Sequence, residues 1–173
     1  MSYKPADEPV NTPTDKPLAG LKVVELGTLI AGPFAARICA EFGADVIKIE
    51  SPDGGDPLRK WRKLYEGTSL WWFVQARNKR SLTLNLKHQD GLKILKELLA
   101  DTDILIENFR PGTLEKLGLG WDVLHALNPR LIMVRLSGFG QTGPLKNQPG
   151  FGAVGESVGG LRYITGFEDR PPV

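Results

Sequence analysis

The sequence contains few of the residues that would define several other classes of protein. One cysteine in 173 residues excludes an internal disulfide framework and fits a reducing compartment. Basic and acidic residues nearly balance, 22 against 20, so the net charge of +2 is too small to indicate bulk affinity for nucleic acid. No apolar run approaches the ~18 residues of a membrane helix, because Arg37 and Glu41 interrupt the best candidate. We therefore expect a cytoplasmic protein that binds neither membrane nor nucleic acid.

The first 17 residues lack the features of a secretory signal. They carry four prolines and several charges but no hydrophobic centre. Residues 1–17 are therefore predicted to form a disordered extension. No internal repeat or long linker follows, and with 41% apolar residues the chain can bury one core. Residues 18–173 are expected to form a single domain.

Strand and helix patterns alternate along the rest of the chain. Short apolar strands are predicted over residues 21–26, 44–49, 81–86, 104–106 and 131–136. Helices are predicted from Pro33 to Phe42, over 70–75 and 89–100, from Thr113, over 121–127, and from Phe151 to Leu161. This alternation favours an α/β fold, Rossmann-like, with a largely parallel sheet and helices on both faces.

The first of these helices has an apolar repeat that predicts which face is buried. The residues at helical spacing are Phe34, Ala35, Ile38 and Phe42. Gly43 follows as a stop signal. Cys39 shares the same face, which favours an inert core thiol over a reactive one.

Polar residues directly follow the predicted strand over 104–106. Asn108 can donate and accept hydrogen bonds, Phe109 offers a ring for stacking, and Arg110 supplies a planar cation suited to phosphate. Ligands of open α/β sheets bind outside the carboxyl ends of the strands. The segment therefore fits a nucleotide-bearing ligand, and it equally fits an ordinary strand-to-helix loop with Pro111 at the start of a helix.

The first strand-to-helix turn contains glycine but not the dinucleotide fingerprint. The pattern from Gly27 to Gly32 and Pro33 lacks the three glycines at fixed offsets that admit a pyrophosphate, which argues against a nicotinamide cofactor. Backbone N–H groups at the following helix start could still face an anion. Both a structural and a ligand-facing turn remain open.

Two basic clusters, residues 59–63 and 77–80, flank a pair of tryptophans, Trp71 and Trp72. Such interleaving can bind single-stranded nucleic acid, but the small net charge disfavours it. An ordinary solvated surface is the better interpretation of the first cluster, whereas a phosphate contact is plausible for the second.

Other catalytic patterns are missing from the sequence. Ser137 lacks the leading glycine of a nucleophile elbow. His88 is expected to begin a helix and His125 to lie on one, as surface or capping residues. No His, Cys and carboxylate cluster has metal-ligand spacing.

Taken together, the segments resemble the class III CoA-transferase family, which includes formyl-CoA transferase, carnitine CoA-transferase and 2-methylacyl-CoA racemases. The matching stretches, in order, are Leu18–Leu26, Ala31–Pro33, Phe42–Glu50, Asn78–Ser81, Glu107–Gly112, Asn128–Ile132 and Leu136–Pro144. The resemblance implies that residues 18–173 form the N-terminal part of the family's large, CoA-binding domain. The fold would then be incomplete at its C-terminus.

The resemblance also places the coenzyme A contacts of the family on this chain. By position they fall on Ile30, Ala31, Ser51, Leu84 to Lys87, Asn108, Phe109, Arg110, Lys116 and Pro149 to Gly152, with Gly150 and Phe151 among the last. Ser51 departs from the arginine of formyl-CoA transferase, which puts a phosphate or adenine contact there in doubt. Coenzyme A or acyl-CoA would be a substrate, with no permanently bound cofactor.

The family reaction moves CoA from an acyl-CoA donor to a carboxylic acid through attack by an aspartate carboxylate. None of residues 1–173 occupies that aspartate's position, so the catalytic residue is unknown. Glu168 and Asp169 lie just before it and are expected to face solvent. The chain is therefore expected to be inactive alone and to require a homodimer or a complementary C-terminal chain. The alternative is a non-catalytic CoA-binding or assembly module.

The racemase branch of the family can be tested at two positions. Its acid/base pair would fall on Phe151 and Gly152. A phenyl ring cannot transfer protons, so the sequence disfavours racemisation.

Overall fold

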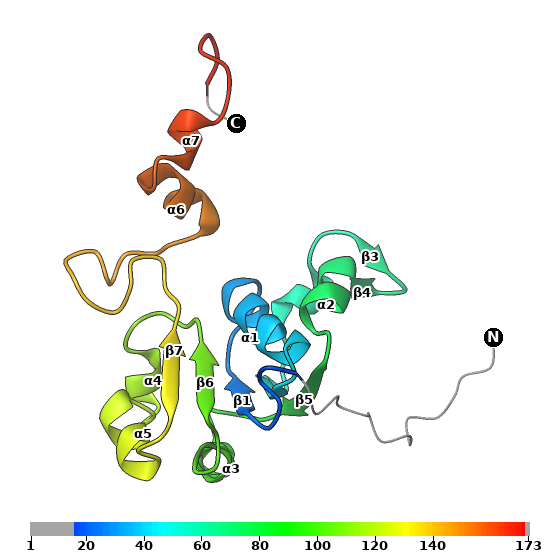
Figure 1. Cartoon of the computed structure of the whole chain (residues 1–173), viewed down its shortest axis with the longest axis vertical. Coiled ribbons are helices and arrows are strands. Elements are labelled where there is room, and N and C mark those ends of the chain that lie inside the picture. The colour runs from blue at the N-terminus through cyan, green and yellow to red at the C-terminus, as the bar shows by residue number, and fades with distance from the viewer. Residues whose placement is uncertain (1–15, 172–173) are drawn as a thin grey trace.

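A computed structural model of the chain describes residues 16–171 (Figure 1). Five strands form one parallel sheet in the order β5-β2-β1-β6-β7. They are β1 (Lys22–Glu25), β2 (Asp45–Glu50), β5 (Lys79–Thr83), β6 (Ile104–Glu107) and β7 (Ile132–Arg135). The helices are α1 (Ala31–Glu41), α2 (Leu70–Gln75), α3 (Gln89–Leu99), α4 (Thr113–Lys116), α5 (Trp121–Leu127), α6 (Gly152–Val158) and α7 (Leu161–Ile164), with a 3-10 helix η1 (Pro57–Lys60). The predicted α/β class and the parallel sheet are confirmed.

The strand order reverses between β1 and β6. From β1 the chain proceeds outward to β2 and β5, then returns across β1 to build β6 and β7 on the other side. The connections that leave the carboxyl ends of β1 and β6 diverge to opposite faces of the sheet, and such a switch point is where open α/β sheets bind ligands. A ligand-binding site is therefore expected at the residues directly after these two strands.

Helix α1 covers one face of the sheet with small residues, not with the predicted aromatic repeat. Its buried residues are Gly32, Pro33, Ala36 and Ala40, which pack with Val23, Val46 and Ile106. Phe34, Ile38 and Phe42 are exposed, so the prediction that they form the core face was wrong. Small side chains at a spacing of four residues let the helix lie close to the strands, and the larger residues then face outward.

The lone cysteine lies at the edge of this packing. Cys39 is half-buried against the small-residue cluster. Burial raises the pKa of its thiol, which reduces the reactive thiolate at neutral pH. This environment agrees with the predicted inert role.

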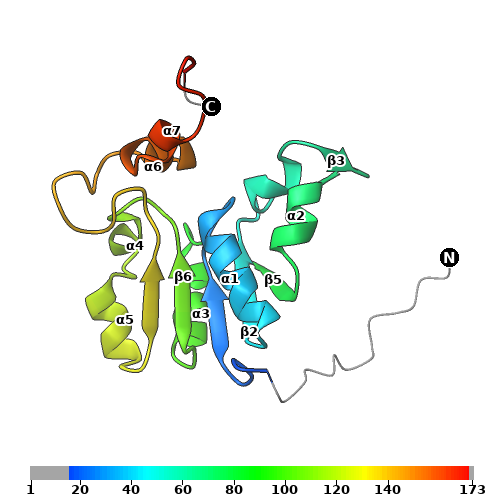
Figure 2. The ribbon, with the colours of Figure 1, turned by 45° about the horizontal axis from the view of Figure 1, so that its top comes forward.

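The opposite face of the sheet carries α3, α4 and α5 over a cluster rich in leucine (Figure 2). The buried members are Val24, Leu26, Ile49, Leu95, Leu99, Leu105, Leu114, Leu119, Leu124 and Leu131. The helices predicted over 89–100, from Thr113 and over 121–127 are confirmed to within a residue. His88 caps α3, because its ring nitrogen accepts from the amide of Asp90 at 3.3 Å.

The edge strand β5 was predicted in the wrong place. It spans Lys79–Thr83 instead of residues 81–86, so part of the second basic cluster lies inside the sheet. The alternating residues that predicted a later strand include Leu84 and Leu86, which pack against the leucine cluster from the loop after β5. The antiparallel hairpin of β3 (Leu64–Tyr65) and β4 (Thr68–Ser69) was not predicted.

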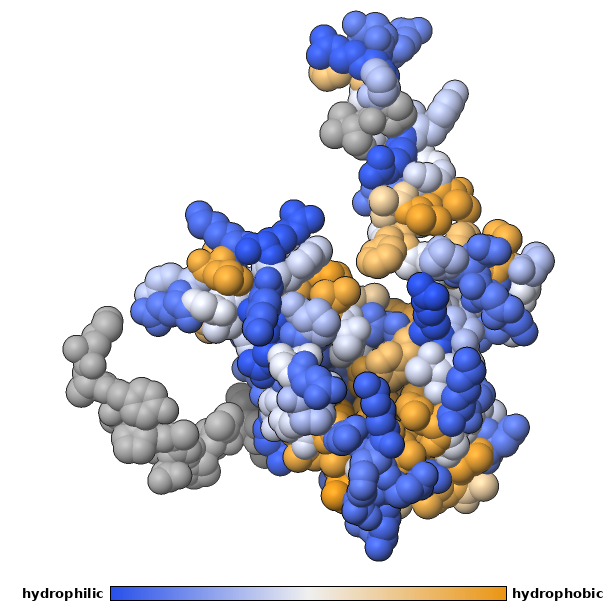
Figure 3. Space-filling view, turned by 180° about the vertical axis from the view of Figure 1, so that it is seen from behind, coloured by the Kyte–Doolittle hydropathy of each residue, from blue (hydrophilic) through white to orange (hydrophobic). Residues whose placement is uncertain are grey.

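Helices α6 and α7 stand apart from the sheet, beyond a long loop that leaves β7 (Figures 1 and 2). The sequence predicted one helix from Phe151 to Leu161, whereas the structure has two helices separated at Gly159 and Gly160, and neither helix contains a buried residue. Apolar side chains consequently form part of their outer surface (Figure 3). The exposed ones include Phe151, Val158, Leu161, Tyr163, Ile164 and Phe167.

Most of the predicted N-terminal extension lies outside the described residues. Its last two residues are described, and Lys16 Nζ donates to the carbonyl oxygen of Glu41 at 3.0 Å. Within residues 16–171 no helix is long and apolar enough to cross a bilayer. The same residues contain no group of three His, Cys, Asp or Glu side chains that could hold a metal ion.

Truncation of a fully buried leucine tests the importance of the leucine cluster. Leu95→Ala on α3 is expected to lower the free energy of unfolding by about 2–5 kcal/mol, because it removes buried methyl groups and leaves a cavity. Urea denaturation measures the change. The neighbouring Ile94 is exposed, and Ile94→Ala should change the stability by less than ~1 kcal/mol. Equal losses in the two variants would contradict the burial of Leu95 in the leucine cluster.

Candidate functional site

The turns that follow β1 and β6 are joined by one side-chain amide. Asn108, directly after β6, accepts the amide N–H of Thr28 on Oδ1 at 2.7 Å. Its Nδ2 donates to the carbonyl oxygen of Thr28 at 2.9 Å. The structure thus brings the predicted Asn108 against the β1–α1 turn, where its amide fixes the turn's backbone.

Two glycines permit this close approach. A Cβ atom added at Gly27 would lie 2.8 Å from the Cα of Gly32 and 3.1 Å from Oδ1 of Asn108. Any side chain at either glycine would push the turn away from the amide. The glycines of the first turn therefore serve a tight junction between the two segments that leave the switch point.

A buried carboxylate orients the rest of the β6–α4 loop. Glu107 accepts the amide N–H of Phe109 on Oε2 and the Nε–H of Arg135 on Oε1, each at 2.7 Å. The Phe109 ring is half-buried against the leucine cluster. Arg110 is exposed, and within residues 16–171 it makes no ion pair. The loop therefore presents a guanidinium to solvent beside the junction.

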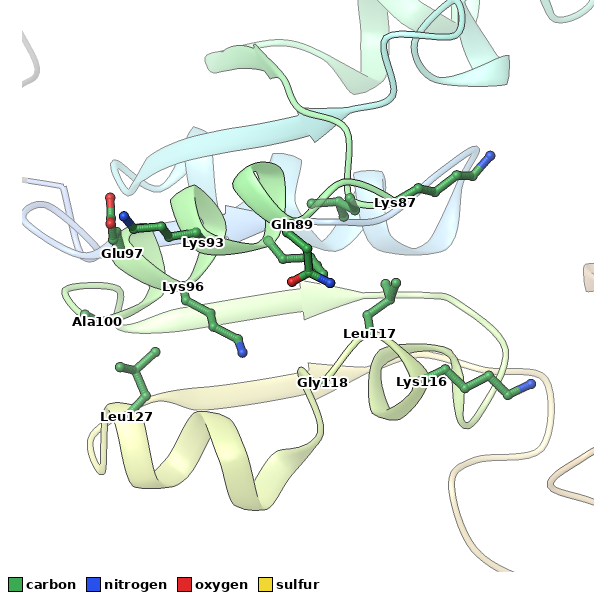
Figure 4. Close-up of a pocket in the computed structure, with 12 residues that line it drawn as sticks. Lys87, Gln89, Lys93, Lys96, Glu97, Ala100, Lys116, Leu117, Gly118 and Leu127 are labelled. Carbon is green, nitrogen blue, oxygen red and sulfur yellow. The ribbon is translucent and has the colours of Figure 1, made fainter.

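A groove of about 840 Å³ runs between α3 and the α4–α5 segment (Figure 4). Lys87 and Lys116, both predicted from the resemblance, extend toward the same end of it. Lys93 and Lys96 also line the groove and were not predicted. Their only acidic neighbour in the lining is Glu97, so the groove has an excess of positive charge.

The other predicted residues of the first three strand ends lie along the same edge of the sheet. Ile30 and Ala31 begin α1, and Ser51 follows β2. The hydroxyl of Ser51 accepts the amide N–H of Asp53 at 3.2 Å. Leu84 packs part of its side chain against the leucine cluster, and its amide N–H donates to the carbonyl oxygen of Glu50 at 2.9 Å.

Gly150 and Phe151 lie on the segment that carries α6. A Cβ atom added at Gly150 would lie 2.3 Å from the Cα of Gly138, so the chain crosses itself closely where the long loop ends. Phe151 is 75% exposed. The position of these two residues relative to the candidate site is therefore set by the long loop after β7.

Four charged side chains beneath the β1–α1 turn were not predicted as a group. Lys48 Nζ lies 2.7 Å from Oε1 of Glu25 and 2.8 Å from Oδ2 of Asp56. Lys79 Nζ lies 2.6 Å from Oε2 of Glu25. All four side chains are 2% exposed or less. The sequence does contain a signal for this network, because Glu25 and Lys48 are charged residues within the apolar strands predicted over 21–26 and 44–49.

This network removes part of the predicted phosphate site at residues 77–80. Burial lowers the pKa of Lys79, and the carboxylate of Glu25 opposes that shift. The Lys79 ammonium is paired with Glu25 inside the protein, so it is not available to a phosphate. Arg80 pairs with Asp45 at the opposite edge of the sheet. The basic cluster is therefore divided between the core and a distant surface.

A second buried carboxylate lies beside the network. Burial by itself would raise the pKa of Glu50, but hydrogen bonds from Arg59, from Ser81 and from the amide of Asp56 lower it to about 2. Arg59 donates to both carboxylate oxygens at 2.7 Å, and its guanidinium lies 3.7 Å from the ring centre of Trp72. The β2–η1 loop is thereby fixed to the ends of β2 and β5.

Comparison with known proteins identifies the family of this chain. The sequence profile described as CoA-transferase family III matches residues 18–173. The chain belongs to this family. The resemblance inferred from the ordered motifs is confirmed.

Relatives of this CoA-transferase family chain are longer than the chain itself. It is 56% identical over 158 residues to succinyl-CoA–D-citramalate CoA-transferase of Chloroflexus aurantiacus, covering 91% of this chain and 39% of that protein. It is 42% identical over 159 residues to human succinyl-CoA:glutarate CoA-transferase, covering 91% and 36%. The chain therefore spans about two fifths of the length of the curated relatives that it matches.

A solved structure agrees with the fold of the family chain. A CAIB/BAIF family protein from Brucella suis superimposes with a TM-score of 0.86 at 40% identity, covering 91% of this chain and 43% of that one. Rv3272 from Mycobacterium tuberculosis gives a TM-score of 0.81 at 35% identity.

The hydrogen bonds of Glu50 predict a specific pH dependence. Its pKa of about 2 lies below the ordinary glutamate value of 4.5, so its contribution to stability is complete above about pH 4.5 and is lost as the pH falls toward 2. Glu50→Gln should lower the unfolding free energy at pH 7 by about 3 kcal/mol and by progressively less below pH 4.5. Urea denaturation between pH 2 and 7 measures this. A difference that is constant across this range would contradict the assignment.

Proposed function

We propose that the protein to which this chain belongs transfers CoA from succinyl-CoA to a second carboxylic acid, and that residues 18–173 hold the CoA. The observation that carries the proposal is the junction of the β1–α1 turn with Asn108 at the switch point of a CoA-transferase family III chain. The named activities of the relatives support a dicarboxylate acceptor, since citramalate and glutarate each carry two carboxyl groups.

The charges along the carboxyl edge suit the nucleotide half of CoA. Arg110, Lys87 and Lys116 are exposed cations near the junction. A guanidinium can bind a phosphate through two parallel hydrogen bonds, whereas each lysine acts as a mobile point charge. Phosphates of CoA would neutralise these cations, and the Phe109 loop would lie beside them.

In the proposed reaction, binding and bond exchange belong to different parts of the protein. A carboxylate oxygen of the enzyme forms a bond to the acyl carbon while the carbon–sulfur bond to CoA breaks, which gives a mixed anhydride and the CoA thiolate. The thiolate then attacks the enzyme's carbonyl carbon, which releases the donor acid and leaves CoA on the enzyme as a thioester. The acceptor carboxylate repeats the exchange in reverse, so that CoA ends on the acceptor and the enzyme carboxylate is regenerated. The resemblance assigns that carboxylate to an aspartate whose position falls outside residues 1–173. Glu168 and Asp169 are exposed in the turn that follows α7 and are distant in sequence from the junction. We assign them no role in the transfer.

One surface favours a second candidate function, a CoA-binding or assembly module without catalysis. The apolar side chains on α6 and α7, such as Tyr163 at 90% exposure, are typical of a surface that contacts another polypeptide. Relatives named as alpha and beta subunits of succinyl-CoA–L-malate CoA-transferase support such an assembly. A stable oligomer that forms equally with and without CoA, measured by light scattering, would favour the module.

The proposed CoA site predicts a selective loss of affinity. Arg110→Ala should weaken CoA binding about tenfold, or ~1.4 kcal/mol, because one charge-assisted phosphate contact is lost. Isothermal titration calorimetry measures the dissociation constant. Arg130→Ala is the matched control, since Arg130 is an exposed arginine before β7 at the opposite edge of the sheet. Equal affinities of the two variants would argue against the site.

The division between binding and bond exchange predicts the behaviour of the 173-residue chain. Incubated with succinyl-CoA and a panel of dicarboxylic acids, it should bind CoA but produce no new CoA ester, because the attacking carboxylate is not among its residues. Chromatographic separation of the CoA esters measures the exchange. Turnover well above the enzyme-free blank would contradict this expectation.

A further inference from the structure

Buried charges beneath the β1–α1 turn hold the backbone of the turn itself. Lys48 Nζ donates to the carbonyl oxygen of Gly27 at 2.7 Å. The amide N–H of Leu29 donates to Oδ1 of Asp56 at 3.0 Å. Side chains from β2 and from the loop after it therefore fix two backbone groups of the turn that follows β1.

A second lysine holds the start of the helix that follows. Lys79 Nζ donates to the carbonyl oxygen of Pro33 at 2.7 Å and also pairs with Glu25. The ammonium of Lys48 is likewise surrounded by oxygen atoms of Glu25, Gly27 and Asp56. Both ammonium groups are enclosed by protein, so neither one points toward a ligand.

The turn has a backbone conformation that its own sequence does not favour. Leu29 has φ of +61°, in the left-handed region that residues with a side chain seldom adopt. Such conformations persist where the surroundings impose them, and they gather at ligand sites. Here the surroundings are the hydrogen bond from the Leu29 amide to Asp56 and the one from the Thr28 amide to Asn108.

We propose that Lys48, Asp56, Lys79 and Glu25 are positioning residues for acyl-CoA. They set the shape of the β1–α1 turn before the ligand arrives, so that binding does not have to order the turn. The inference rests on the proposed function, because it takes CoA as the ligand of that turn. It assigns to Asp56 and to the buried charges of three family motifs, Leu18–Leu26, Phe42–Glu50 and Asn78–Ser81, a role in affinity that does not require contact with CoA.

The test removes one cation and one anion together. In the double variant Lys48→Met/Asp56→Ala, the remaining Glu25 and Lys79 still balance each other, whereas Gly27 and Leu29 lose their partners. We expect the amide protons of the turn to exchange with solvent at least about tenfold faster. The dissociation constant for CoA should rise about tenfold or more. NMR measures the hydrogen exchange, and isothermal titration calorimetry measures the dissociation constant. Both are carried out well below the temperature at which each protein is half unfolded.

A matched control removes an exposed ion pair between β2 and β5. Asp45→Asn/Arg80→Met deletes one anion and one cation at the opposite edge of the sheet, where the side chains are 52% and 65% exposed. It should change neither the exchange of the turn nor the CoA affinity. Similar losses in this control would overturn the positioning role.

A milder variant keeps the test decisive if the first one does not fold. Lys48→Met/Asp56→Asn has the same charge balance, but Asn retains an oxygen that can accept from the Leu29 amide. It should protect that amide almost as well as the unmodified chain and lose less CoA affinity than the alanine variant. In the alanine variant, unchanged turn exchange with intact CoA binding would overturn the positioning role alone. In the asparagine variant, which still lacks the Lys48 donor to Gly27, a CoA affinity equal to that of the unmodified chain would do the same. Absence of CoA binding by the unmodified chain would instead overturn the proposed function.

Discussion

The candidate site depends on a network of four buried charges that joins three strands to one turn. Glu25, Lys48 and Lys79 come from β1, β2 and β5, and Asp56 comes from the loop after β2. Removing one partner of a buried ion pair typically costs about 3–5 kcal/mol, because the other charge stays buried. That is a large share of the ~5–15 kcal/mol by which domains are stable. The order of the strands and the shape of the turn therefore depend on each other.

A second set of contacts completes the junction from the other side of the switch point. Asn108 holds the turn by its backbone, and Glu107 holds the loop on which Asn108 lies. The two sets approach the turn from strands on either side of β1. The exposed cations along the edge are thus presented by loops whose backbones are fixed from beneath, which is how a rigid scaffold supports a binding loop.

Much of this architecture could be predicted from local patterns. Apolar runs bounded by turn signals located β1, β2, β6 and β7, and helical spacing located α3. The importance of Asn108 could also be predicted, because an amide after a buried strand lies at the edge where sheets bind ligands. Its actual partner, the backbone of Thr28, is 80 residues away and could not be read from the pattern.

The failures have the same physical origin. Lys79 belonged to a basic cluster and was placed outside the strand, because its partner Glu25 lies 54 residues earlier in the chain. In α1 the aromatic repeat suggested a core face, whereas the sheet selected the small residues Ala36 and Ala40. Contacts between distant segments decided both cases, and single-sequence periodicity contains no information about them.

The crossing of Gly138 and Gly150 has a consequence for engineering the protein. The loop between them leaves and returns at nearly the same point, since an added Cβ at Gly138 would lie 2.4 Å from the Cα of Gly150. Lengthening a flexible loop with fixed ends costs only about 0.6 kcal/mol for each doubling of its length. An epitope or a fluorophore-bearing peptide inserted near Lys146 would therefore leave the direction of α6 unchanged.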